Sequence, residues 1–398
     1  MARVEDDPRV AEAKARSVPE LVDRLEIAGL SQVSGELIGP CPLCGGDDRF
    51  GINLTSKRFQ CRRCEIKGGD TIALVMQVLR KTFPQALTWI CGDLPPDLSP
   101  EERRRRKAKA EASQKRTEDQ AEKKRQDAIK AAKRIWEQGE PPRETPVEAY
   151  LVEFRGLKGV LDVIGKSLRF HPDLPYMQMR DGEWVELHRG PAMLAAVQSP
   201  DGHGRCVHRT WLDLNEPDGK LVLRDKDGAP LVDANGKRPK VKKTLGSKQG
   251  GAIRLITPKV TDTIIMGEGI ETTLTAYVAG PPELRGAAFW AGVDLGNMAG
   301  QPERIPGKKW SNLPKLDQTK PSFVPPEWVR RLIYIKDGDS QPTMTQAYLE
   351  RGLHRARSLR PGLETAIVSP PSGLDLNDVL LGKTPKNTRM RADHGQRS

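Results

Sequence analysis

The chain has 398 residues, enough for two or three domains, and its 37% hydrophobic and 30% charged residues predict folded domains with a large solvated surface. It contains no run of eighteen apolar residues, and its first residues, MARVEDDPRV, lack an apolar stretch, so we expect no membrane span, no secretory signal and a cytoplasmic protein. A net charge of +12 favours a polyanionic partner, nucleic acid before an anionic membrane surface.

Residues 1–92 are predicted to form a small domain with flanking helices. A short helical pattern at 18–25 precedes a stretch rich in glycine and cysteine, 36–70. Apolar residues at three- and four-residue intervals then predict a helix over 72–79. Because so small a domain has little apolar material to bury, we expect a bound metal to stabilise it.

Two C-x-x-C pairs, Cys41 with Cys44 and Cys61 with Cys64, are separated by sixteen residues. In a reducing compartment this spacing is typical of a structural Zn²⁺ site and not of disulfides. The residues between the pairs alternate enough to predict a two-stranded hairpin that carries the second pair. A site closed by four thiolates leaves no open position, so this metal would stabilise the fold without taking part in chemistry.

Basic side chains in the same stretch are interleaved with Phe50 and Phe59. Cations beside aromatic rings suit phosphate contact and base stacking, but the rings could equally be the small core of the ribbon, with the cations merely solvated. We expect the rings to be buried. The basic candidates for nucleic-acid contact are Arg49, Lys57, Arg58, Arg62 and Arg63.

Residues 93–140 are predicted to be a charged helical linker that begins at a proline-rich break, 93–100. The segment 101–134 holds fourteen Lys and Arg residues, seven Asp and Glu residues and almost no apolar ones. It is either a solvated helix or a flexible tether. Contact with nucleic acid through the four arginines 103–106 is an open alternative.

The remaining chain is predicted to hold a mixed α/β region, 141–258, an α/β domain, 259–384, and a flexible tail, 385–398. In the second of these, short apolar runs alternate with helical stretches, which indicates a parallel sheet covered on both faces. Functional residues of such sheets gather beyond the carboxyl ends of the strands. The apolar runs are 263–266, 287–291, 332–335 and 365–368.

Three carboxylates follow two of these predicted strands. Glu268 stands between two glycines after the first strand, and Asp337 and Asp339 follow the third, on the same side of the extended chain. Converging carboxylates repel one another unless a cation joins them, and oxygen ligands suit Mg²⁺ or Mn²⁺. Such metals orient a phosphate and neutralise the charge that develops on it. The sequence therefore predicts a catalytic metal site at this edge of the sheet.

Together these features resemble the DnaG-type primases of bacteria and phages. The run CPLCGGDDRFGIN…FQCRRC…KGGDTIALV is similar to their CHC2-type zinc ribbon, but it has a plain cysteine pair and no histidine ligand. The stretch 260–380 resembles a Toprim domain, with EGIETTL as its glutamate motif and DGD as its DxD motif. The segments YLVEFRGL, PAMLAAV, HRTWLDL and KKTLG resemble Toprim proteins of phages and mobile elements.

The resemblance implies a multidomain α+β protein: a Cys₄ zinc ribbon, a mixed α/β primase core and a C-terminal Toprim domain. Its implied function is that of a DNA primase of the bacterial cytosol, encoded by a phage or mobile element, which joins nucleoside triphosphates on a single-stranded DNA template. The GKT triplet at 382–384 lacks the upstream glycine of a P-loop, so a separate replicative helicase or initiator is the expected partner.

By the same resemblance Glu268 would be the acid/base or metal-anchoring glutamate, with Asp337 and Asp339 as Mg²⁺ ligands. Many such primases have an aspartate where this chain has Thr272, and Glu271 either substitutes for it or faces solvent. Lys336 stands where a small residue is usual, and it would either pair with a substrate phosphate or weaken metal binding.

The middle region would supply template and nucleotide contacts. Its candidates are Arg209, Lys242 and Lys243, which are either substrate ligands or solvated loop cations. His208 is expected to be a packed histidine and not a base. Two other functions stay open: a Toprim nuclease, and a non-catalytic replication accessory protein that binds single-stranded nucleic acid.

Overall fold

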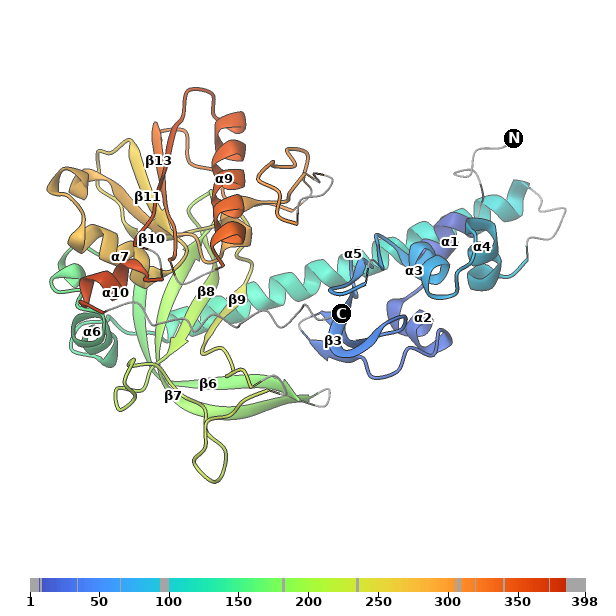
Figure 1. Cartoon of the computed structure of the whole chain (residues 1–398), viewed down its shortest axis with the longest axis horizontal. Helices are drawn as coiled ribbons and strands as arrows, with labels where there is room; N and C mark the ends of the chain where they lie inside the picture. The colour runs from blue at the N-terminus through green and yellow to red at the C-terminus, as the bar shows by residue number, and fades with distance from the viewer. Residues whose placement is uncertain are drawn as a thin grey trace, which may run out of the picture. The chain divides into compact units, whose positions relative to one another are not determined.

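The computed structural model describes residues 7, 9–33, 35–64, 66–93, 100–180, 183–233, 236–303, 305, 309–318, 320–338, 341–371 and 373–383. The chain divides into two compact units, Met1–Arg125 with Met179–Val185, and Gln126–Gln178 with Glu186–Ser398 (Figure 1). It is a mixed α/β protein, as predicted, and the described residues form three sheets. The predicted tail, 385–398, lies outside them. No helix in the described ranges is both long and apolar enough to cross a membrane.

The first unit is built on a five-stranded antiparallel meander in which each strand pairs with the next along the chain. Side chains cap two of its helices, since Ser17 accepts a hydrogen bond from the N–H of Glu20 and Asp70 accepts one from the N–H of Ala73. The strands are β1 (Ser31–Val33), β2 (Glu36–Cys41), β3 (Gly45–Asn53), β4 (Phe59–Cys61) and β5 (Lys67–Gly68). The helices are α1 (Arg9–Ala15), α2 (Val18–Arg24), α3 (Thr71–Val78) and α4 (Phe83–Cys91).

The core of this unit contains both phenylalanines of the ribbon. Phe50 on β3 and Phe59 on β4 are buried, and their ring centroids lie 6.2 Å apart. Ile72 and Val75 of α3 belong to the same apolar cluster. The expectation that these rings form the core of the ribbon is therefore confirmed, and neither ring is available for base stacking.

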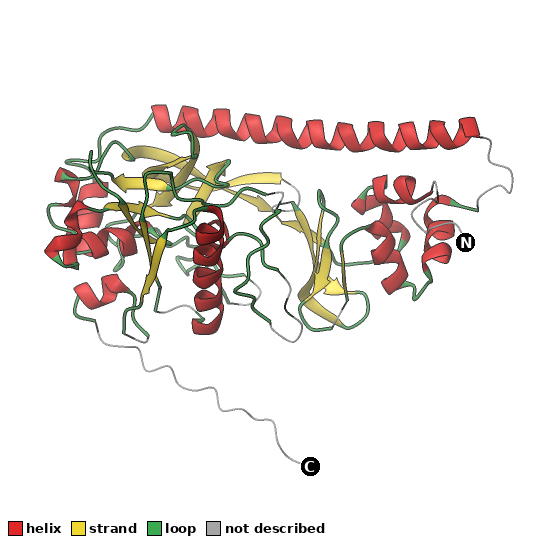
Figure 2. Ribbon diagram, turned by 90° about the horizontal axis from the view of Figure 1, so that it is seen from above, coloured by secondary structure: helices red, strands yellow, loops and turns green. Residues whose placement is uncertain are grey.

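The charged segment after the first domain forms one helix, α5 (Pro100–Glu137) (Figure 2). Most of its described side chains are exposed, as in the first of the two alternatives that the sequence left open, a solvated helix or a flexible tether. Its last turns differ, because Ala132 is buried and Trp136 packs against an apolar cluster that includes Tyr176 and Trp211. The C-terminal end of α5 is thus part of the core of the second unit.

The first sheet of the second unit has four strands in the order β6-β7-β8-β9, in which β8 pairs antiparallel with β7 and with β9. Before it come α6 (Pro146–Ala149), a π-helix (Tyr150–Phe154) and a 3₁₀ turn (Val160–Asp162). The strands are β6 (Leu168–Arg180), β7 (Glu183–Gln198), β8 (Gly204–Trp211) and β9 (Lys242–Gly246). Between β8 and β9 a loop insert is held by isolated bridges such as the one that joins Leu212 to Lys220.

Each of the four apolar runs after residue 260 forms a strand of a second, five-stranded sheet of order β10-β12-β11-β13-β14. Strand β11 pairs in parallel with β12 and β13, β13 pairs in parallel with β14, and β10 is an antiparallel edge. The strands are β10 (Ile253–Ile256), β11 (Thr263–Gly267), β12 (Ala288–Ala291), β13 (Arg331–Ile335) and β14 (Glu364–Val368). The helical elements are α7 (Ile270–Ala279), a 3₁₀ turn (Pro282–Gly286), α8 (Leu295–Ala299), α9 (Pro342–Leu359) and α10 (Leu376–Leu380).

Both faces of this sheet are covered. Ile265 on β11 belongs to the apolar cluster that includes Leu274 of α7, whereas its neighbour Ile264 belongs to the cluster that includes Leu349 of α9. The chain therefore leaves β11 along one face and β13 along the other, as Figure 1 shows for α7 and α9. In such a topology the crevice between the carboxyl ends of β11 and β13 is where ligands bind.

Candidate active site and candidate zinc centre

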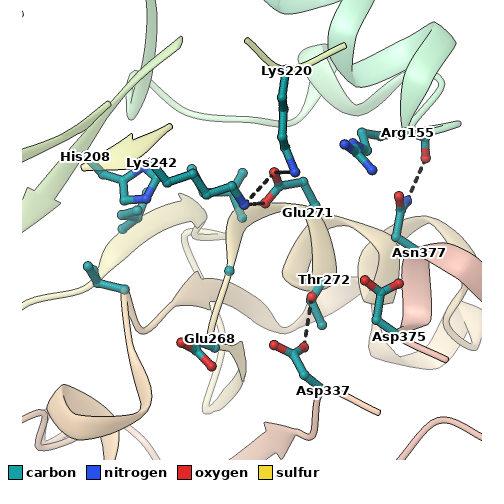
Figure 3. Close-up of a pocket in the computed structure, with 14 residues that line it drawn as sticks. Arg155, His208, Lys220, Lys242, Glu268, Glu271, Thr272, Asp337, Asp375 and Asn377 are labelled. Atoms are coloured by element: carbon teal, nitrogen blue, oxygen red, sulfur yellow. Dashed lines mark hydrogen bonds and ion pairs between the residues drawn. The ribbon is translucent and has the colours of Figure 1, made fainter. Parts of the chain in front are cut away.

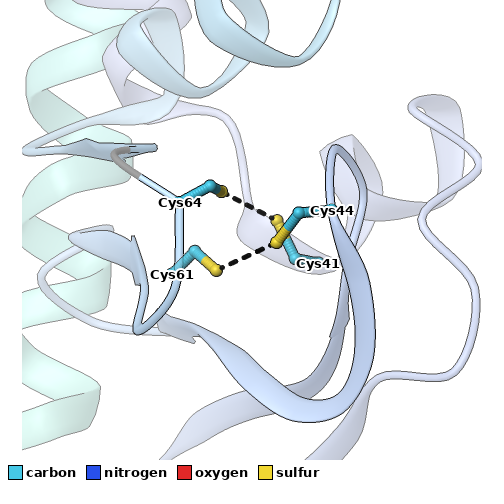
Figure 4. A group of neighbouring side chains, drawn as sticks. All are labelled: Cys41, Cys44, Cys61 and Cys64. Atoms are coloured by element: carbon cyan, nitrogen blue, oxygen red, sulfur yellow. Dashed lines mark hydrogen bonds between the residues drawn. The ribbon is translucent and has the colours of Figure 1, made fainter. Parts of the chain in front are cut away.

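The four cysteines of the first unit come together at one point (Figure 4). The Sγ atoms of Cys41 and Cys64 lie 3.5 Å apart, as do those of Cys44 and Cys61. Zn²⁺ with Zn–S bonds of about 2.3 Å requires tetrahedral S···S edges of about 3.8 Å, so the arrangement fits zinc. Among the described residues this is the only group of three or more side chains that could hold a metal ion.

The basic side chains of the ribbon have different environments. Arg58, Arg62 and Arg63 are exposed, with Arg62 3.6 Å from Asp48. The Lys57 ammonium donates to the carbonyl of Lys14, and burial lowers the pKa of Lys57. Arg49 is half-buried. Contact between these five residues and nucleic acid stays a prediction. The three exposed arginines are the ones whose side chains lie at the surface, outside the core of the ribbon.

The second unit has a cavity of about 390 Å³ beside the carboxyl ends of β11 and β13 (Figure 3). It is lined on one side by acidic groups that follow the two strands, and on another by cations from earlier parts of the chain. The charged and polar residues that line it are Arg155, His208, Lys220, Lys242, Glu268, Glu271, Thr272, Asp337, Asp375 and Asn377.

Glu268 and Asp337 reach this cavity from the carboxyl ends of neighbouring strands. Glu268 directly follows β11, and Asp337 follows β13 by two residues and accepts a hydrogen bond of 3.1 Å from the Thr272 hydroxyl. At Gly338 a Cβ atom would lie 1.8 Å from the Leu374 carbonyl oxygen, so only glycine fits. The third predicted carboxylate, Asp339, lies outside the described residues.

The surroundings of Glu268 disfavour the charge of its carboxylate. Burial, and then the nearby Asp337 and Asp294, raise the pKa of Glu268 to about 7. Two half-buried carboxylates with excess negative charge are the kind of oxygen donors that Mg²⁺ or Mn²⁺ fits.

Glu271 neither faces solvent nor joins this pair. It is buried on the first turn of α7, and its carboxylate bonds to Lys242, Lys220 and Tyr150. Figure 3 shows it turned toward these lysines, whereas Glu268 and Asp337 lie together below. The motif predicts a catalytic role for Glu271, and its contacts indicate that any such effect would be exerted through Lys220 and Lys242.

The two consecutive lysines of β9 point to opposite faces of the sheet. Lys242 lines the cavity, whereas the Lys243 ammonium lies 3.7 Å from the Tyr176 ring centroid and donates to the Met177 carbonyl. Arg209 lies over the Trp211 ring on the same side as Lys243. Of the three predicted substrate cations, only Lys242 reaches the cavity.

Two further predictions concern residues beside the motifs. The Lys336 ammonium donates to the Gln346 side chain on α9, so a side chain of the same protein holds it in place. His208 lines the cavity, and burial, followed by the nearby Lys242, lowers its pKa to about 4. His208 is therefore neutral at neutral pH, consistent with a packed side chain.

Several residues of the site were not singled out by the sequence. Lys220 belongs to a turn-rich insert, and Tyr150 and Arg155 lie in the YLVEFRGL segment, whose resemblance gave no role to either residue. Asn377 lies in the stretch DLNDVL, residues 375–380, on the first turn of α10. Its amide donates to the Arg155 carbonyl at 2.8 Å and to the Thr275 hydroxyl at 3.1 Å, which ties α10 to the cavity wall.

Known proteins resemble this chain only weakly in sequence and structure. A family model described as a domain of unknown function (DUF7146) matches residues 126–255. No curated protein matches the chain. A DNA primase domain from Pseudomonas aeruginosa is similar at 14% identity and a TM-score of 0.34, over 64% of this chain and 74% of that one. The primase fragment of the bacteriophage T7 primase-helicase protein is similar at 13% identity and a TM-score of 0.26, over 87% and 95%.

Proposed function

We propose that this protein is a DNA primase that joins nucleoside triphosphates on a single-stranded DNA template. The observation that carries the proposal is the cavity at the ends of β11 and β13. There Glu268 and Asp337 share one space with Lys220 and Lys242. A site with metal-binding oxygens on one side and cations on the other suits a ligand that carries both a metal and phosphates.

The reaction would join a 3′-hydroxyl to the α-phosphate of an incoming nucleotide and release pyrophosphate. Glu268 and Asp337, with Asp339 as a further predicted ligand, would hold Mg²⁺ or Mn²⁺. When bound, such a metal neutralises phosphate charge and orients the attack. The chain's own cations, Lys220 and Lys242, lie where they would bind the other phosphate oxygens.

The first unit fits a role in holding the template. Its zinc-binding cysteines would stabilise a ribbon whose exposed arginines, Arg58, Arg62 and Arg63, would contact backbone phosphates without sequence preference. Because no P-loop motif was found, we expect a separate helicase or initiator to deliver the protein to its template. The template-holding role is part of the same proposal. The protein would act in the bacterial cytosol, in the replication of a phage or mobile element.

The test uses single-stranded circular DNA, labelled nucleotides and either Mg²⁺ or Mn²⁺. Wild type is compared with Asp337→Asn, which keeps the shape of the side chain, and with Asp317→Asn, whose side chain is 83% exposed in the same unit. We expect short oligomers from wild type and Asp317→Asn, and at least about 100-fold fewer from Asp337→Asn.

Two results would replace the proposal. If the wild type binds the circle and makes no oligomers with either metal, the protein is a non-catalytic accessory that binds single strands. If it cuts the circle and Asp337→Asn does not, it is a nuclease that uses the same carboxylates.

A further inference from the structure

Glu271 pairs with three side chains at the wall of the cavity, Lys242, Lys220 and Tyr150. Its Oε1 lies 2.8 Å from the Lys242 ammonium and 3.3 Å from the Lys220 ammonium, and its Oε2 accepts from Lys242 at 2.9 Å. The residue is only 8% exposed. One buried carboxylate thus bridges two lysines, one from β9 and one from the insert between β8 and β9.

The position of this carboxylate is fixed from behind by a second set of contacts. The Tyr150 hydroxyl donates to Glu271 Oε1 at 2.6 Å and accepts from Arg155 Nε at 3.1 Å. Arg155 is itself held by the Asp218 carbonyl at 2.8 Å. Tyr150 is fully buried, so its hydroxyl has a fixed position. The hydrogen bond from this hydroxyl therefore holds the Glu271 carboxylate in one orientation.

The charges of the cluster depend on one another. Burial lowers the pKa of Lys220 to about 8, Lys242 and Arg155 lower it as well, and Glu271 opposes them. Burial alone would raise the pKa of Glu271, but Lys242 and Lys220 hold it well below its usual range. The other titratable groups that face the cluster are the Tyr150 hydroxyl, the neutral His208 and Glu268, whose pKa is lowered by Lys242 against the larger effect of burial.

We propose that Glu271 is a positioning residue that holds Lys220 and Lys242 side by side as paired phosphate-binding cations. The proposal rests on the proposed function for the identity of the ligand, the triphosphate of a nucleotide. An ammonium has three N–H donors, and the contacts to Glu271 use at most two on each lysine. The remaining donors are available to phosphate oxygens in the cavity.

Without its charge, Glu271 could no longer keep the pair together. In Glu271→Gln, Lys220, Lys242 and Arg155 would face one another in a partly buried wall with no anion between them. Lys220 would then lose its proton near neutral pH, so the net charge of the wall would hardly rise while its order would be lost. The substitution should therefore weaken phosphate binding.

The test measures binding of inorganic tripolyphosphate to the full chain by calorimetry, in buffer freed of divalent metal by a chelating resin so that the ribbon keeps its zinc. We expect Glu271→Gln to bind roughly tenfold more weakly than wild type at pH 7.5, the loss of about one charge-assisted contact. The control is Glu153→Gln, an exposed glutamate of the π-helix that carries Tyr150, and it should bind like wild type.

The pH profile separates positioning from a purely structural role. Binding to wild type should decline as pH rises through about 8, where Lys220 loses its proton, and in Glu271→Gln the decline should begin at lower pH. Equal or tighter binding by Glu271→Gln over the whole range would overturn the inference, because Glu271 would then only neutralise the lysines.

A second pair of variants keeps the test decisive if Glu271→Gln does not fold. Tyr150→Phe releases the carboxylate without removing its charge, and Lys220→Gln removes one of the held cations. If Glu271 couples them, the loss of binding in the double variant should be smaller than the product of the two single losses. Independent effects would overturn the inference. Since neither template nor metal is present, failure to make primers would not affect this result.

Discussion

Replacing Gly338 by alanine tests whether the position of Asp337 sets the activity. The added Cβ would lie 1.8 Å from the Leu374 carbonyl oxygen and 3.1 Å from Pro370 Cγ, whereas such contacts do not fall below 3.0 Å. The loop after β13 and the segment at Leu374 must therefore separate by more than about 1 Å, and we expect the loop to move. A displacement of this size at reacting groups costs on the order of 100-fold in rate.

The assay is the rate of primer synthesis at saturating nucleotide, together with thermal unfolding. The matched control is Gly286→Ala, an exposed position where the added Cβ meets nothing within 4 Å. We expect the control to keep its rate, and Gly338→Ala to lose about 100-fold in rate while it still unfolds cooperatively. If Gly338→Ala made primers within about twofold of the control, the argument that this loop fixes the carboxylate would be wrong.

Three further predictions follow from the same contacts. Purified protein should contain one zinc per chain, and Cys61→Ser should release it and unfold the ribbon, measured by metal analysis and proteolysis. Thr272→Val, which removes the donor to Asp337, should lower the rate of primer synthesis roughly fivefold, with no change expected if Thr272 is only a packing residue. Because its partners depress the pKa of Glu271, its stabilisation is present above the unfolded pKa of about 4.3 and is lost as pH falls below it. Urea unfolding of the second unit should therefore show a smaller acid destabilisation in Glu271→Gln than in wild type.

Much of the site could be predicted because it depends on local patterns. Each cysteine pair forms its own turn, so spacing alone indicated that four sulfurs would meet. The apolar runs before Glu268 and Asp337 predicted two buried strands, and the carboxyl ends of parallel neighbours lie at one edge of a sheet. These inferences needed no knowledge of which distant segment packs where.

The cationic side of the cavity could not be predicted in the same way. Tyr150 and Glu271 are 121 positions apart, and Lys220 comes from an insert whose sequence indicates only turns. The sequence grouped Lys242 with Lys243 as equal candidates, whereas consecutive residues of a strand point to opposite faces and only Lys242 borders the carboxylates. Such contacts depend on tertiary packing, for which a single sequence carries no local signal.

The topology of the second sheet has a consequence for how the protein folds. Glu268 and Asp337 meet only when β11 pairs with β13, after the intervening chain has gone out to β12 and returned. Contacts of such long sequence separation carry a large loop-closure entropy and form slowly. During synthesis, a nascent chain whose β13 segment has not yet left the ribosome therefore has no complete site. The ribbon, whose ligands lie within a short stretch near the N-terminus, can take up its metal first.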